Sequence, residues 1–447
     1  MTNHQWKVSA LAALTFATLA QQSHAAGFML TEQSALALGR SYAGVGVDGS
    51  DLSGTFYNPA TMVLHKGTNA QVGGVGLQLN LDYANNDSTI RENGRGQDKI
   101  IPNFFFNRQI NDTTWFGLGI TVPYGMATEY DDNWEGRERG IAASILAVDI
   151  NPNFAFKINE KFSIGVGASI QYAEAELKIG KNIPGNTNYN IPEIRTTSNL
   201  EVDSLAWGYN FGFMYQPVES IRLGVSYRSS INHQADGDFT ATANLSGKQI
   251  IGIADQILAV DSKNPEALAL KELGGLVHAG TVDGAAGLKT PQQILVSGAW
   301  DINEVVSIYG TFRWADWSTF NELPVKAAGN VVTTLHNKWK DTYLTTAGMD
   351  LRLTNWWTLR GGLGMETSPI SDPRTRTAII PDAKRWWFSI GSSFMLSNDL
   401  QADVAFAHLH GVEERSLYAS DAPDSEKIGK LRKLDAFLLG AQIQYKF

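Results

Sequence analysis

Hydrophobic and polar residues alternate along much of the chain. In residues 437–447, apolar side chains stand at every second position, with Gly440, Gln442, Gln444 and Lys446 between them. Because successive side chains of a strand point to opposite faces, the pattern predicts strands with one apolar and one polar face. The same alternation recurs at 221–228, 306–314, 357–366 and 400–406.

The connections between these strands sort by length. Six short polar connections alternate with seven longer ones, so thirteen connections join fourteen strands. Short turns on one rim and long loops on the other are typical of an outer-membrane β-barrel, whereas a soluble β-sandwich alternates without sorting its loops. We therefore expect an all-β fold, a 14-stranded antiparallel transmembrane barrel over residues 68–447. The short connections lie near 109–112, 158–161, 216–220, 301–304, 353–355 and 396–399, and the long ones near 85–98, 127–139, 181–199, 237–289, 321–338, 368–384 and 411–433.

The first 25 residues have the features of a secretory signal peptide. Lys7 precedes a short apolar run at 8–20, and Ser23 and Ala25 supply small residues before a cleavage point. The run is too short for a membrane anchor. We expect cleavage after Ala25 and export of residues 26–447.

Composition removes several classes of function. The chain has no cysteine, which excludes disulfides and thiolate-ligated metals, and its formal net charge is −9 without a concentrated basic stretch, which argues against nucleic acid. No Gly-x-Ser-x-Gly motif is present and histidines are few, so we expect neither an enzyme nor a cofactor. His408 and His410 share one strand face, but they continue a lipid-facing phase, which favours an interfacial position over a metal site.

Residues 26–67 lack the strand alternation and precede the first strand. They are rich in glycine and contain an Asn58-Pro59 turn signal. A barrel of about 14 strands encloses a lumen too wide for its own side chains to fill. The segment is too apolar for a solvated tail, so we predict that it plugs the lumen, and we name it the hatch. Its large apolar residues are Phe28, Met29, Leu30, Leu36, Leu38, Phe56, Met62 and Leu64.

Spaced motifs across the exported chain give a resemblance to a known family. The sequence resembles the FadL family of outer-membrane transporters for long-chain fatty acids and other hydrophobic compounds. The resemblance implies a 14-stranded barrel in the outer membrane of a Gram-negative bacterium, with an N-terminal hatch whose motif is Asn58, Pro59 and Ala60. The matching stretches are AGFMLTEQSALALGRSYAG (26–44), NPA (58–60), VPYGMATEYDDNW (122–134), WKDTY (339–343), SPISDPRTRTAIIPDAKRWWFSIG (368–391) and HG (410–411).

The stretch FGLGITVPYG, 116–125, interrupts a strand. Its alternation places Val122 toward lipid and Gly117 and Gly119 toward the lumen. Pro123 removes a hydrogen-bond donor, and since a closed barrel has no edge strand, we predict a local gap in strand pairing. The resemblance implies a lateral opening here; the alternative is that Pro123 only begins a loop. The residues of this predicted opening are Gly117, Gly119, Pro123, Tyr124 and Gly125.

The long connection at 237–289 contains two predicted helices. Ile250, Ala254, Ile257 and Leu258 share one helical face, and the second helix begins at Asn264-Pro265. We expect these helices to form a groove at the cell surface that collects ligand. A lid that packs only on itself is the alternative.

Several charged residues are candidates for a contact with a ligand carboxylate or for polar positions in the lumen. A carboxylate would need one cation in an otherwise apolar pocket, because an unpaired buried charge is costly. The alternative is that each cation pairs with an acid of the lumen. The basic residue that the resemblance implies near the end of the strand from Phe162 is absent, and Ile179 stands there. The candidates are Lys338, Lys340, Arg360 and Glu366.

Taken together, these features predict a passive transporter of hydrophobic molecules. We expect long-chain fatty acids, with aromatic or aliphatic hydrocarbons as the alternative on the same scaffold and a general diffusion porin as the alternative from another class. The last residues, Ile443, Tyr445 and Phe447, are typical of the signature by which the barrel assembly machinery recognises its substrates. The other expected partners are outer-membrane lipid and lipopolysaccharide, and we expect a monomer.

Overall fold

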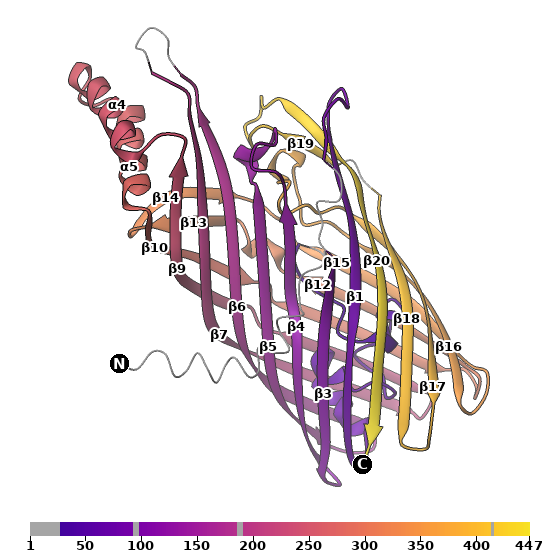
Figure 1. Ribbon diagram of the computed structural model, residues 1–447. Coiled ribbons are helices and arrows are strands. Elements are labelled where there is room, and N and C mark those ends of the chain that lie inside the picture. The colour runs from indigo at the N-terminus through magenta and orange to yellow at the C-terminus, as the bar shows by residue number, and fades with distance from the viewer. Residues whose placement is uncertain (1–26, 93–97, 186–190, 413–414) are drawn as a thin grey trace.

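A computed structural model describes residues 27–92, 98–185, 191–412 and 415–447 and shows one closed antiparallel β-barrel (Figure 1). Each wall strand pairs with the next, and the last pairs with the first through Asn69–Lys446 and the residues that follow. The prediction of a 14-stranded barrel is confirmed. The wall strands are β1 (Thr68–Asn85), β3 (Lys99–Asn111), β4 (Thr114–Glu129), β5 (Ala142–Lys157), β6 (Phe162–Ile183), β7 (Ile194–Val218), β8 (Ile221–Arg228), β11 (Gln293–Asp301), β12 (Val306–Ala315), β15 (Thr342–Arg352), β16 (Trp357–Glu366), β17 (Arg385–Met395), β18 (Leu400–Gly411) and β20 (Lys427–Lys446).

The outer face of the wall is apolar over a broad band. Large hydrophobic side chains at alternate strand positions are exposed, as expected where lipid takes the place of water. Trp207 on β7, 77% exposed, is the most exposed tryptophan of the described residues. Among those residues, no helix is both long and apolar enough to cross a membrane. Other exposed positions of the band include Val166, Phe211, Val225, Phe312, Phe388, Phe406 and Leu439.

The rim with the long connections carries further strands and helices. β9 (Ile231–Ala243) and β10 (Thr281–Thr290) pair with each other beyond β8 and β11, so part of the connection predicted at 237–289 is strand. Helices α4 (Gly247–Val260) and α5 (Pro265–Ala279) lie together at this end, away from the C-terminus (Figure 1). The remaining elements here are β2 (Arg91–Glu92), β13 (Glu322–Ala327), β14 (Asn330–His336), β19 (Ser416–Tyr418), η3 (Arg137–Arg139), η5 (Trp317–Thr319) and η6 (Pro373–Thr375).

The hatch occupies the inside of the barrel. It folds into α2 (Ala35–Leu38), α3 (Gly54–Tyr57) and η2 (Pro59–Leu64), and nearly all of residues 27–62 are buried. The core of the molecule therefore lies between the hatch and the inner wall, instead of between two sheets. The predicted signal peptide lies outside the described residues.

Candidate functional site

The Asn58-Pro59-Ala60 turn is held by its own side chain and by the wall. Asn58 caps η2 by accepting a hydrogen bond from the Ala60 N–H (3.1 Å), and its amide donates to the carbonyls of Gly46 (2.8 Å) and Phe213 (3.1 Å). Proline suits the first position of such a turn because its missing N–H has no intrahelical partner there. A Cβ on Gly165 of β6 or Gly212 of β7 would collide with this turn. The turn therefore packs closely against a part of the wall where two glycines leave room for it.

A first buried ion network ties the middle of the hatch to the wall. The Arg40 guanidinium contacts Asp48 of the hatch and Asp350 of β15 (3.2 Å), and it lies over the Tyr309 ring at 3.9 Å. Asp350 also binds Arg360 of β16 (3.2 Å). Arg360 is therefore a buried polar contact of the lumen that pairs with a lumen acid, which is the alternative given above for the candidate cations.

A second network lies around Glu32. Glu366 binds Arg313 (2.8 Å) and Arg385 (3.2 Å), while Asp382 accepts from Arg385 (3.0 Å) and from the Gly27 N–H (3.0 Å). Glu32 is fully buried here, and both its carboxylate oxygens lack a hydrogen-bond partner among the described residues. Burial, with the Glu366 charge nearby, raises the pKa of Glu32 to about 8, and burial raises the pKa of Asp382 to about 6. Since three acids face two arginines, the network favours a proton on Glu32.

The wall has a gap in its hydrogen bonding beside the hatch. Pairing of β3 with β4 ends at Phe104–Ile120, and the register of β4 against β5 shifts between Thr121 and Tyr124. A strand edge without partners is costly in the membrane, where water cannot satisfy it. The predicted irregularity at Pro123 is therefore present as a kink within β4, and Pro123 does not begin a loop.

The start of the hatch fills the free edge of β4. The Leu30 N–H donates to the Pro123 carbonyl (2.8 Å), and the Gly125 N–H donates to the Phe28 carbonyl (2.8 Å). Gln33 adds a donor to the Val122 carbonyl (2.8 Å). The hatch thus acts as a short extra strand at the place where the wall is incomplete.

Val122 and its neighbours close the gap with apolar contacts. Val122 is 4% exposed and packs with Leu30, Ile101 and Leu146, so the expectation that it faces lipid is wrong. Gly117 and Gly119 face inward as expected: a Cβ on Gly117 would collide with Met62 of the hatch, and one on Gly119 would press on Phe105.

Phe28 sits in an aromatic cluster beside the kink. Its ring lies 4.6 Å from Trp317, 5.3 Å from Phe320, and 6.1 Å from both Trp339 and Tyr124. Rings at these distances in edge-on arrangement stabilise each other beyond simple burial. Phe28 therefore joins β4 to the connection that follows β12.

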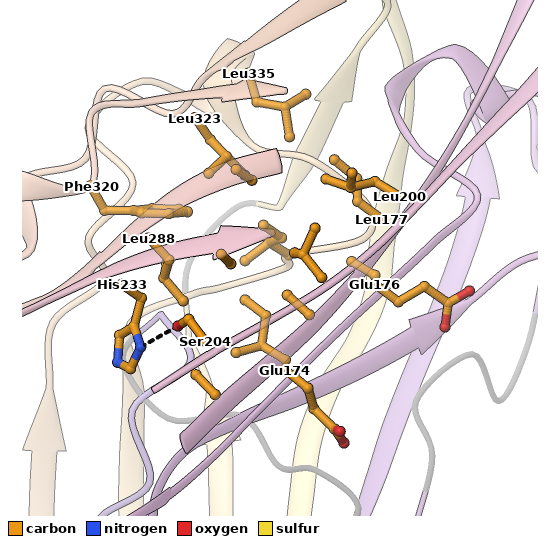
Figure 2. A pocket seen from close by; sticks show the side chains of 18 residues that line it. Glu174, Glu176, Leu177, Leu200, Ser204, His233, Leu288, Phe320, Leu323 and Leu335 are labelled. Carbon is orange, nitrogen blue, oxygen red and sulfur yellow. Dashed lines mark hydrogen bonds between the residues drawn. The ribbon is translucent and has the colours of Figure 1, made fainter. Parts of the chain in front are cut away.

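Phe320 also lines an apolar cavity (Figure 2). Few polar side chains line the cavity. Ser204 and His233 are hydrogen-bonded to each other (2.7 Å), and His233 is also hydrogen-bonded to Gln171 (2.9 Å). The carboxylates of Glu174 and Glu176 point away from the cavity in Figure 2. The lining includes Ala143, Ile145, Ala173, Leu177, Leu200, Val202, Ala235, Leu288, Leu323, Leu335 and Ile380.

The sequence analysis missed this cavity, although one signal for it was present. In β6 the outward face is apolar up to Ile170, and the inward face becomes apolar from Ala173 onward. That change of phase marks the height at which lipid contact ends and an apolar interior begins. The aromatic partners of Phe28 had no comparable signal, because they come from distant connections.

Other predicted residues lie elsewhere. Lys338 is exposed and pairs with Asp421 (3.3 Å), and Lys340 is exposed, so neither lines the cavity. Ile250 and Ala254 are fully buried where α4 packs on α5 and on the ends of the wall strands. They hold the two helices together, so the prediction that they line an open groove is wrong. Ile257 and Leu258 on the next turn of α4 are half-buried.

Comparisons with known proteins agree with this architecture. The family model for outer membrane transport proteins of the OMPP1/FadL/TodX type matches residues 16–447. A long-chain fatty acid transport protein of Escherichia coli is 27% identical over 97% of both chains, and a 47 kDa outer membrane protein of Pasteurella multocida is 26% identical over 98% of both.

Solved structures show the same fold. A FadL homologue from Pseudomonas aeruginosa superposes with a TM-score of 0.81 at 22% identity, covering 94% of this chain and all of the other. The toluene transporter TodX of Pseudomonas putida gives 0.69 at 14% identity, covering 94% and 99%. With a family match over nearly the whole chain, an outer-membrane barrel and an N-terminal hatch, the chain belongs to the OMPP1/FadL/TodX family of outer-membrane transporters for hydrophobic compounds.

Proposed function

We propose that this protein moves long-chain fatty acids passively inward and releases them sideways at the kink of β4. The observation that carries the proposal is the position of Phe28–Leu30. On one side Phe28 contacts Phe320, which lines the apolar cavity; on the other, this segment bonds to β4 where the wall is incomplete. On this proposal the hatch separates the cavity from the gap, and its displacement would connect them.

The apolar cavity would receive the acyl chain. Transfer of an alkyl chain from water to such a lining is favourable by roughly 0.8 kcal/mol for each buried methylene group. Most of the lining comes from inward-facing positions of β6, β7, β9 and β10, at the end of the barrel that bears the long connections. This end meets a ligand before the hatch does.

A second, smaller cavity lies beside the kink and would receive the carboxylate. Met29 and Pro123 line it together with Arg228 and Arg313. Both guanidinium groups already have an acid, Asp149 for Arg228 (3.0 Å) and Glu366 for Arg313 (2.8 Å). A ligand carboxylate would share these donors through charge-assisted hydrogen bonds. The name of the Escherichia coli relative supports the same ligand class.

Uncharged aromatic or aliphatic hydrocarbons are the second candidate ligands. No lysine or arginine lines the apolar cavity, and a carboxylate buried there would be unpaired. A hydrocarbon would need no such partner. A general diffusion porin is the less favoured alternative from another class, because the buried hatch fills the lumen.

Uptake separates these candidates. Gram-negative cells without their own transporter would express this protein and receive labelled oleate or labelled toluene. Leu288→Asp places a charge in the cavity and should reduce uptake at least about tenfold, because burial of a charge is costly. Leu268→Asp, on an exposed face of α5, is the matched control. Oleate uptake supports the proposal, toluene uptake alone supports the hydrocarbon candidate, and uptake of neither overturns both.

A further inference from the structure

Two imidazoles and a carboxylate meet on the outer face of the barrel near the rim with the long connections. His408 and His410 alternate on β18, and the register of β18 against β20 places Asp435 directly opposite His410. The three candidate ligand atoms lie within 4.8 Å of one another, and within the described residues no other group of three such side chains converges in this way. The sequence analysis favoured an interfacial position over a metal site because the two histidines continue a lipid-facing phase. It did not consider Asp435, which lies 25 positions beyond His410 in the chain.

Neighbouring residues hold the cluster in shape. His410 Nδ1 lies 2.8 Å from Asp435 Oδ1, and the His408 ring stacks on Phe437 at 4.7 Å with an interplanar angle of 17°. The two imidazole rings are 5.8 Å apart. The side chain of His410 is about half exposed, near the end of β18 at the rim with the long connections.

We propose that His408, His410 and Asp435 form a binding site for a divalent transition-metal ion such as Zn²⁺. Imidazole nitrogen with one carboxylate oxygen is a donor set that suits zinc, whereas magnesium and calcium prefer oxygen alone. Zinc bonds of about 2.1 Å place tetrahedral ligands about 3.4 Å apart, which small rotations of these exposed side chains achieve. Water would take the fourth position, as in other sites with three protein ligands.

A bound ion would link β18 to β20 across their outer face. These strands adjoin the closure of the barrel, where β20 pairs with β1. Binding to the folded protein alone raises its stability by mass action. The ion would therefore act as a clamp on this side of the rim, separate from the hatch and the apolar cavity.

Zinc titration of the purified, detergent-solubilised protein tests the site. The exported chain, carrying a tag without histidine and stripped with a chelator, would be titrated with zinc chloride in a calorimeter. We expect one saturable site, weakened at least about tenfold in His410→Ala and in Asp435→Asn. His278→Ala, an exposed histidine of α5, is the matched control and should bind like the unmodified protein.

Thermal unfolding and metal selectivity provide two further tests of the site. Zinc should raise the thermal unfolding midpoint of the unmodified protein and leave that of His408→Ala unchanged, and magnesium at the same concentration should have no effect. All three substitutions are at exposed or half-buried positions, so the barrel should form, which heat-modifiable electrophoretic mobility checks. Absence of saturable binding, or equal binding by His410→Ala, would overturn the proposal.

Discussion

Single residues decide how the hatch rests against the wall. The Asn58 turn needs Gly165 and Gly212 beneath it, and Met62 needs Gly117, because a Cβ at any of these glycines would overlap the hatch. At the same scale, Arg40 satisfies one acid of the hatch and one of the wall. Glu32 is the exception, since its carboxylate is buried without a hydrogen bond among the described residues. A buried carboxylate without a hydrogen-bond partner destabilises the packing of the hatch in the barrel unless the carboxyl group is protonated.

Protonation of Glu32 should therefore control how tightly the hatch is seated. The groups around it are Glu366 and the arginines Arg313 and Arg385, and its pKa is raised from an ordinary 4.5 to about 8. Because the seated hatch binds the proton more tightly than a displaced one, seating weakens as pH rises from about 4.5 to about 8. Hydrogen exchange of hatch amides, corrected for intrinsic rates, should be at least about tenfold faster at pH 8 than at pH 5.

Glu32→Gln is the control for this pH dependence. The amide stays neutral at every pH and has nearly the same shape, so exchange in the hatch should remain slow at both pH values. The unmodified protein and the variant should agree at low pH. Equal acceleration in both at high pH would assign the effect to other groups and contradict the role of Glu32.

At the scale of elements, the start of the hatch supplies backbone hydrogen bonds that β4 lacks. β4 loses its partner β3 after Ile120, and Phe28–Leu30 replaces it over a few residues. Loss of this short pairing would expose hydrogen-bonding groups of the backbone at the gap, and these must find ligand or water. We call the segment Phe28–Leu30 the latch, because under the proposed function its displacement would open the wall at this place.

A reversible disulfide tests the latch. Met29 and Tyr124 face each other as an antiparallel pair, a spacing that a disulfide can bridge, and the chain has no cysteine of its own. The double variant Met29→Cys with Tyr124→Cys should lose oleate uptake when oxidised, down to the level of cells without the protein, and regain it with dithiothreitol. Mass spectrometry of the purified protein reports the degree of crosslinking.

The matched control places a disulfide within the wall. Gln401 and Gln444 are paired residues of β18 and β20, far along the barrel from the hatch start, and their replacement by cysteine ties no moving part. This variant should transport equally with and without reductant. Full uptake by a completely crosslinked Met29–Tyr124 pair would show that the latch need not move.

At the scale of the whole molecule, strand alternation and loop length were enough to predict the barrel, and the apolar content of residues 26–67 was enough to predict a plug. Contacts between distant parts of the chain were beyond the sequence. Lys338 pairs with Asp421, 83 positions away, and Arg40 of the hatch pairs with Asp350 of the wall. The helical face of α4 was correct, but pattern alone cannot say whether such a face meets ligand or a second helix, and Ile250 meets α5.

Removal of residues 26–67 tests the hatch as a plug of the whole barrel. A 14-stranded barrel without internal filling should hold a continuous water channel, because its wall side chains cannot span the lumen. In a planar bilayer, the intact protein should therefore conduct little, and the deletion variant should show large, stable single-channel steps. The oxidised Met29–Tyr124 variant, with its hatch fastened, should conduct no more than the intact protein. Heat-modifiable mobility would verify that the deleted barrel still folds; a folded barrel with unchanged conductance would mean that the wall connections, and not the hatch, close the lumen.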